Sequence, residues 1–228
     1  MTRITVAVAL TLSLFASAQP RGRGNHQWGR GPDLWHPDRV GNLLALQQLC
    51  TSSFYYASQA DQCVRTLSAM PFDASATVKA CSSAVYYDSD KLKCLETVAS
   101  SRVDLSATVT ACDASQYYDS DVLKCVQLAS DARRDLSDVV RSCESAMYYD
   151  SDVRKCVETV ARAPSCHASV AAQVVTACDQ AMYYDSDAMK CVEQALPLGE
   201  RAAEVVRFCD QTRPYDSQAL SCIGAFNG

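Results

Sequence analysis

The chain has 228 residues, a net charge of −5 at pH 7 and thirteen cysteines. Beyond residue 41, 24 Asp and Glu face 16 Lys and Arg, and this acidic balance argues against nucleic acid or an anionic membrane surface as the partner of that part. After the first 18 residues, no apolar run approaches the roughly 20 residues that a membrane-spanning helix needs, so we expect no transmembrane segment.

Residues 1–18 have the pattern of a signal peptide. Arg3 precedes an apolar run over 4–15, and Ala16-Ser17-Ala18 has the small-x-small pattern of a cleavage site. We therefore expect export, to the periplasm or outside the cell. Such compartments are oxidising, so we expect the cysteines to form disulfides.

Residues 19–41 form a separate segment that carries five of the eight glycines of the chain. Glycine and proline at this density predict a disordered arm. Trp28 and Trp35 stand among arginines and could contact an anionic glycan or lipid. A solubilising leader or linker is the alternative role for this segment.

Residues 42–228 form a tandem array in which a cysteine is followed six times, after twelve residues, by another cysteine. The pairs are Cys50 with Cys63, Cys81 with Cys94, Cys112 with Cys125, Cys143 with Cys156, Cys178 with Cys191 and Cys209 with Cys222. Their first members lie 31, 31, 31, 35 and 31 residues apart, which divides the array into units of about 42–72, 73–103, 104–134, 135–169, 170–200 and 201–228. A fixed period near 30 residues indicates a solenoid whose units bury their apolar faces against each other.

The pattern within one unit predicts two short helices. Helix starts are indicated by N-cap residues eight positions before the first cysteine of the first four units, at Asn42, Asp73, Asp104 and Asp135. Apolar residues then recur in steps of three and four, and a second stripe of this kind begins at the second cysteine. The expected fold class is therefore all-α, a solenoid of six αα-hairpins.

A disulfide within each hairpin fits this geometry, because residues equidistant from the turn of an antiparallel hairpin face each other. The midpoint of Cys112 and Cys125 falls between Tyr118 and Asp119, inside the turn. The alternative pairing joins the second cysteine of one unit to the first of the next. That gap varies from seventeen to twenty-one residues whereas the twelve-residue gap is constant, so we favour pairing within the hairpin.

The turn of four units contains Tyr-Tyr-Asp-Ser-Asp. All six units keep the second Tyr and the Ser, whereas the first unit has Ala57 in place of the first Asp and the last has Pro214 in place of the first Tyr. We expect the second Tyr to pack at the bend. We expect the Ser or the first Asp to cap the second helix, and the second Asp to interact with the helix dipole.

Two functional alternatives to capping remain for the turns. Stacked turns would form a rim of tyrosines and acids suited to a cationic or aromatic-rich polypeptide. The same acids are hard oxygen ligands and could bind calcium, although no EF-hand pattern surrounds them. The candidate rim residues are Tyr86, Tyr117, Tyr148, Tyr183, Asp88, Asp90, Asp119, Asp121, Asp150, Asp152, Asp185 and Asp187.

Cys166 is the thirteenth cysteine and has no counterpart in another unit. We expect it to be free or to form an intermolecular disulfide, which would give a disulfide-linked homodimer. His167 is adjacent, but a catalytic dyad requires facing side chains and a third orienting group. We find no other catalytic set, no metal-ligand cluster and no phosphate loop, so we expect no enzymatic activity and no cofactor.

The hairpin period with one bridge per hairpin resembles secreted, disulfide-stapled αα-repeat proteins of the Sel1-like and tetratricopeptide kind, over about residues 42–228. The chain departs from Sel1 units in its period of 31, its cysteine spacing and its lack of the small-residue glycine motifs, so no family residue carries over. The resemblance implies a binding or scaffold role with a protein or peptide partner. A structural or calcium-binding module is the alternative function.

Overall fold

The computed structural model describes residues 37–228 except 69, 71, 164–166 and 228. These residues contain twelve α-helices, one 3-10 helix and no strand, which confirms the all-α prediction. The helices are α1 (Pro37–Ser53), α2 (Ala57–Leu67), α3 (Ala74–Ala84), α4 (Asp88–Ser101), α5 (Ser106–Ser115), α6 (Asp119–Ala132), α7 (Ser137–Ala146), α8 (Asp150–Arg162), α9 (Ala168–Ala181), α10 (Asp185–Ala195), η1 (Leu196–Arg201), α11 (Ala202–Thr212) and α12 (Asp216–Ala225).

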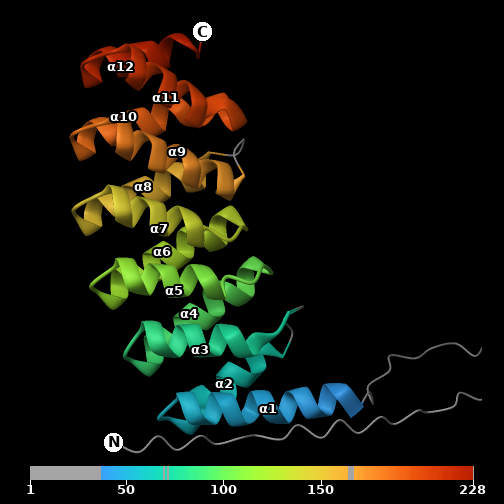
Figure 1. Ribbon diagram of the computed structural model, residues 1–228. Coiled ribbons are helices and arrows are strands. Elements are labelled where there is room, and N and C mark those ends of the chain that lie inside the picture. The colour runs from blue at the N-terminus through green and yellow to red at the C-terminus, as the bar shows by residue number, and fades with distance from the viewer. Residues whose placement is uncertain (1–36, 69, 71, 164–166, 228) are drawn as a thin grey trace, which may run out of the picture. The chain divides into compact units, whose positions relative to one another are not determined.

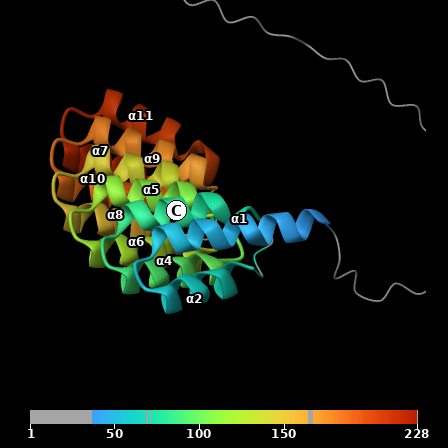
Figure 2. The ribbon, with the colours of Figure 1, turned by 90° about the horizontal axis from the view of Figure 1, so that it is seen from below.

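Consecutive helices pair into six hairpins, from α1 with α2 to α11 with α12, and the hairpins stack in chain order (Figures 1 and 2). The odd-numbered helices pack on one another in one layer and the even-numbered helices in a second layer. Each hairpin therefore presents its α–α turn on the same edge of the stack.

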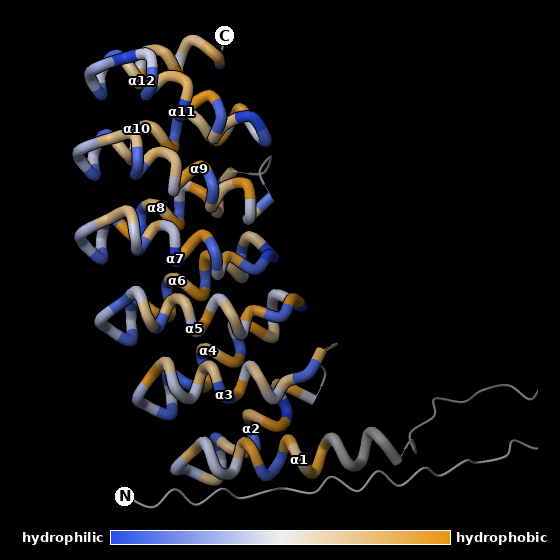
Figure 3. The backbone as a smooth tube through the Cα atoms, in the orientation of Figure 1, coloured by the Kyte–Doolittle hydropathy of each residue, from blue (hydrophilic) through white to orange (hydrophobic). Residues whose placement is uncertain are grey.

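The core is the seam between the two layers. The predicted stripes are buried there, including Val139, Val140 and Cys143 of α7 and Cys125 and Val126 of α6. Along each helix, apolar residues alternate with polar ones, and the hairpin turns at the left of the view are hydrophilic (Figure 3). Helices of ten to seventeen residues are marginal alone, so this packing supplies most of their stability.

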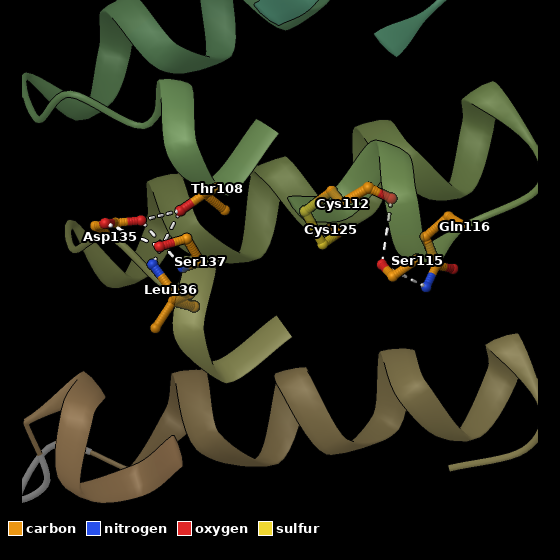
Figure 4. Close-up of a disulfide and its surroundings, with 8 residues drawn as sticks. All are labelled: Thr108, Cys112, Ser115, Gln116, Cys125, Asp135, Leu136 and Ser137. Atoms are coloured by element: carbon orange, nitrogen blue, oxygen red, sulfur yellow. Dashed lines mark hydrogen bonds between the residues drawn. A yellow bond between two sulfur atoms is a disulfide. The ribbon is translucent and has the colours of Figure 1, made fainter. Parts of the chain in front are cut away.

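One disulfide joins the two helices of each hairpin, which confirms the twelve-residue pairing and excludes the alternative register. The six bridges connect Cys50 to Cys63, Cys81 to Cys94, Cys112 to Cys125, Cys143 to Cys156, Cys178 to Cys191 and Cys209 to Cys222. The Cα atoms of Cys112 and Cys125 lie 5.9 Å apart, and both side chains are buried (Figure 4). Each bridge closes a short loop and is expected to contribute about 3 kcal/mol on the chain-entropy treatment.

Of the predicted N-cap aspartates, Asp73 is the N-cap of α3, whereas Asp104 and Asp135 stand one residue before the N-caps of α5 and α7, Leu105 and Leu136. The carboxylates of Asp73, Asp104 and Asp135 accept hydrogen bonds from the backbone N–H two residues later, at 2.9–3.0 Å. Asp135 also ties two units together, because its Oδ1 accepts the Thr108 hydroxyl at 2.6 Å and that hydroxyl accepts the Leu136 N–H at 2.9 Å (Figure 4).

The prediction for the first unit was wrong, because Asn42 lies inside α1 and not at its start. The helix begins at Pro37, and proline is favoured in the first helical turn, where its missing N–H would have no helical partner. Residues 37–41 of the expected arm are therefore helical. The expected signal peptide and the remainder of the arm lie outside the described residues and stay predictions.

Candidate functional site

The second tyrosine of each turn stands directly before the second helix of its hairpin. Tyr87 has an extended backbone, and its carbonyl oxygen accepts the N–H groups of Asp90 and Lys91, both at 2.9 Å. No side chain caps α4, so the expected capping by the serine or the first aspartate was wrong. The reason is that the helix starts one residue after Tyr87, which leaves Asp88 and Ser89 already inside its first turn.

The first aspartate of each turn instead bonds to the preceding unit. Oδ2 of Asp88 accepts the backbone N–H of Tyr55 at 2.7 Å and that of Tyr56 at 3.3 Å. The same bond recurs at every later step, from the first tyrosine of one unit to the first aspartate of the next. These bonds join Tyr86 to Asp119 at 2.8 Å, Tyr117 to Asp150 at 3.3 Å, Tyr148 to Asp185 at 2.9 Å and Tyr183 to Asp216 at 2.9 Å.

This chain of hydrogen bonds explains both end substitutions. The first unit has no unit before it, so an aspartate at Ala57 would find no tyrosine N–H to accept. In the last described unit, Pro214 stands where the first tyrosine would offer an N–H to a following unit. Because proline has no backbone N–H, no donor is left without an acceptor at this position. The residues that differ in the first and last described units are thus those whose counterparts bond to an adjacent unit.

In three of the four units that keep it, the second aspartate forms an ion pair within its own helix. Asp90, Asp121 and Asp187 each accept from the lysine three residues later, at 2.8–3.1 Å. The two end units that lack this aspartate also lack the lysine, since they have Gln62 and Ser221 there. Lysine and aspartate therefore occur together, and the pairing, along with the dipole of the first turn, accounts for the second aspartate.

All eleven tyrosines of the chain lie in these turns, and all are exposed. We call this row the tyrosine rim: Tyr55, Tyr56, Tyr86, Tyr87, Tyr117, Tyr118, Tyr148, Tyr149, Tyr183, Tyr184 and Tyr215. The first tyrosines of the turns are 81–88% exposed and the second 60–67%. The second tyrosine, which we expected to pack at the bend, contacts the first tyrosine in five turns but stays exposed, while residues beside the turn, such as Val85 and Leu92, fill the interior.

The two tyrosines of each complete pair hold each other in a fixed arrangement. In five turns the rings meet edge to face at 87–88°, with centroids 4.9–5.2 Å apart. This is a favoured geometry for aromatic pairs. The backbone of each first tyrosine is also anchored to the next unit, so the rim presents ordered aromatic surface on a helical scaffold.

A row of exposed serines accompanies the tyrosines. The serine after the first aspartate is exposed in every unit, and within the described residues its hydroxyl makes no hydrogen bond. These residues are Ser58, Ser89, Ser120, Ser151, Ser186 and Ser217. The serine is thus shared by all six units, although its hydroxyl makes no hydrogen bond within the described residues.

The structure brings the predicted rim residues together along one edge, but it divides their roles. The first aspartates join neighbouring units, most of the second aspartates pair with lysines, and the tyrosines remain available to a ligand. Sequence reasoning omitted Tyr55 and the second tyrosines from the rim. The signal that could have identified them was the recurrence of the second tyrosine in all six turns and of the first in five.

The carboxylates of the turns offer little to a metal ion. Among the described residues, no three or more His, Cys, Asp or Glu side chains form a group that could hold one. Burial, and then the charge of Asp119, raise the pKa of Asp113, and burial and then the charge of Asp185 raise the pKa of Asp179.

Cys166 lies outside the described residues, so its expected free or intermolecular state stays a prediction. His167 is the residue before α9 and its side chain makes no capping bond. The other two histidines, His26 and His36, also lie outside the described part.

No protein-family model matches the sequence, and no curated protein or solved structure matches it either. None of the described helices is long and apolar enough to cross a membrane. The six disulfides indicate an oxidising compartment. The architecture agrees with the stacked helical hairpins that the sequence resemblance implied, while the link to Sel1-like or tetratricopeptide proteins rests on architecture alone.

Proposed function

We propose that this protein is an exported, non-enzymatic binding or scaffold protein that engages a polypeptide or envelope component along its tyrosine rim. The observation that carries the proposal is that every tyrosine of the chain lies on one edge of the stack and is exposed. Contiguous exposed aromatic surface is uncommon on soluble proteins and marks interaction sites.

The chemistry of the rim favours an extended polypeptide. Tyrosine supplies apolar contact area and a hydroxyl at a low cost in side-chain entropy, which makes it a frequent residue of binding surfaces. Stacked helices lie about 8–10 Å apart, so the distance between neighbouring tyrosine pairs is about the span of three residues in an extended chain. An extended chain could therefore meet one tyrosine pair with every third residue.

The charge of the array favours a cationic partner. The array carries eight more acidic than basic residues, and an arginine or lysine over a tyrosine ring gains a cation–π attraction. The calcium alternative gains no comparable support from the geometry. The first aspartates are occupied by tyrosine N–H groups, and three of the four second aspartates are paired with lysines.

Selection of displayed random peptides against the full-length protein tests the proposal. We expect peptides rich in arginine or aromatic residues that lose at least about 100-fold in affinity when Tyr86, Tyr117, Tyr148 and Tyr183 are all changed to Ala. Phe208→Ala with Phe226→Ala is the matched control, because this exposed edge-to-face pair lies away from the rim. Peptides that bind the rim variant as tightly as the wild type would contradict the proposal.

A further inference from the structure

The step between the fourth and fifth units differs from the other steps. Four extra residues separate Cys156 from Cys178, and α9 has 14 residues where α5 and α7 have 10. A groove of about 380 Å³ lies between α8 and α10, and its lining includes Asp152, Lys155, Met189 and Glu193. The groove begins three residues after Tyr149, the second tyrosine of its turn, so it adjoins the tyrosine rim.

The preceding step shows how an arginine is held at this place. Nη1 of Arg154, on α8, donates to Oδ1 of Asp121 on α6 at 2.8 Å. Asp121 is the second aspartate of its turn, and Arg154 is the fifth residue after Tyr149. One unit later, the aspartate is Asp152 and the fifth residue after Tyr184 is Met189. The groove therefore keeps the aspartate that pairs with an arginine in the preceding step, but Met189 stands where that arginine would be.

Asp152 also lacks the partner that the other second aspartates have. Asp90, Asp121 and Asp187 pair with the lysine three residues later, whereas Asp152 and Lys155 form no ion pair within the described residues. Glu193, on the facing helix, has none there either. Lys190, the second cation of the lining, is held by Asp187 at 2.8 Å. Of the three carboxylates that line this groove, Asp185 accepts the backbone N–H of Tyr148 at 2.9 Å, whereas the side chains of Asp152 and Glu193 form no ion pair or hydrogen bond within the described residues.

We propose that this groove is an arginine-binding site, which takes one arginine side chain of the polypeptide that runs along the tyrosine rim. The guanidinium lies between Asp152 and Glu193, where its planar donors suit two carboxylates better than a lysine ammonium does. The aliphatic part of the arginine packs on Met189. The proposal rests on the proposed function and adds a fixed anchor position to it.

Fluorescence anisotropy with the full-length protein tests this site. The probes are two fluorescein-labelled nine-residue peptides of Gly and Pro, one with a central arginine and one with the neutral isostere citrulline. We expect the arginine peptide to bind at least about 10-fold more tightly, because hydrogen bonds to charged groups are stronger than neutral ones. Asp152→Asn and Glu193→Gln should each remove most of this preference, and Asp90→Asn, at another step, should retain it.

Met189→Arg is the sharpest variant, because it supplies from within the chain the arginine that the preceding step already has. We expect it to fill the groove and abolish the preference for arginine while the disulfides and helical content stay unchanged. Equal binding of the two peptides to the wild type, or a preference that survives in Met189→Arg, would overturn the arginine site. Equal binding that still depends on Tyr148 and Tyr183 would overturn it and leave the proposed function standing.

Discussion

Replacement of Asp88 by alanine is expected to detach the first hairpin from the rest of the array. Asp88 accepts two backbone N–H groups of the preceding turn, and it pairs with Lys91 at 3.1 Å. Both side chains of that pair are largely buried, at 10% and 16% exposure. Hydrogen bonds to charged groups contribute about 1.5–3 kcal/mol, so we expect Asp88→Ala to cost about 3 kcal/mol at this interface.

Hydrogen exchange followed by mass spectrometry measures this loss locally. Because units of a solenoid contact only their neighbours, amides of α1 and α2 should exchange about 100-fold faster while those of α7 to α12 do not change. Two variants serve as controls. Asp90→Ala removes only a pair with the exposed Lys93 and should cost less than about 1 kcal/mol. Ala57→Asp adds a carboxylate without a donor and should change stability by about 0.5 kcal/mol or less.

The pH dependence provides an independent check. Burial raises the pKa of Asp88, but the hydrogen bonds from Lys91, Tyr55 and Tyr56 and the Lys91 charge outweigh it, so the pKa lies below its ordinary value. A lowered pKa contributes stability above the unfolded-state pKa and loses it as the pH falls through the folded-state value. The difference between the wild type and Asp88→Ala should therefore shrink below about pH 4. A difference no larger than that of Asp90→Ala, or one independent of pH, would refute the reasoning.

Three further variants test the scaffold by chemical denaturation. Changing both Cys112 and Cys125 to Ala should cost about 3 kcal/mol, because it removes a short-loop constraint from the unfolded state; no loss would contradict that contribution. Arg102→Gly should gain up to about 1 kcal/mol, because Arg102 has a φ of 59° at the end of α4; a loss would show that its side chain matters. Asp113→Asn should raise the stability by less than about 0.5 kcal/mol at neutral pH. This gain should fade as the pH falls through the raised pKa of Asp113, because the wild-type carboxyl is then protonated. A gain that grows with acid would contradict the repulsion from Asp119.

Most of the fold was predictable because the repeat makes each local signal recur. The constant twelve-residue gap identified every disulfide, and steps of three and four between Val139, Cys143 and Ala146 identified a buried helical face. Asp73 and Asp135 marked helix starts because their bonding partners lie only two residues away. Asn42 was a wrong prediction of a helix start because α1 begins earlier, at Pro37, and no other unit has a proline at the corresponding position.

The roles within the turn were not predictable, because they depend on contacts between units. Aspartate suits both a cap for the following helix and an acceptor for the preceding turn. The identity of Asp119 therefore does not reveal which of the two roles it has. The distinction needs the distance of 2.8 Å between its Oδ2 and the Tyr86 nitrogen, 33 residues away. A packing role for Tyr87 at the bend was expected from the presence of this tyrosine in every unit, yet a residue shared by all units can serve a surface as well as a core.

The central claim is that the tyrosine rim is the binding surface of this protein. Uniform labelling with 3-fluorotyrosine gives a fluorine NMR spectrum that reports on this rim alone, because all eleven tyrosines belong to it. Titration with a peptide selected against the wild type should shift the resonances of several adjacent turns, and the shifts should saturate with the dissociation constant found by calorimetry. A peptide that binds by calorimetry and leaves all tyrosine resonances unchanged would contradict the claim.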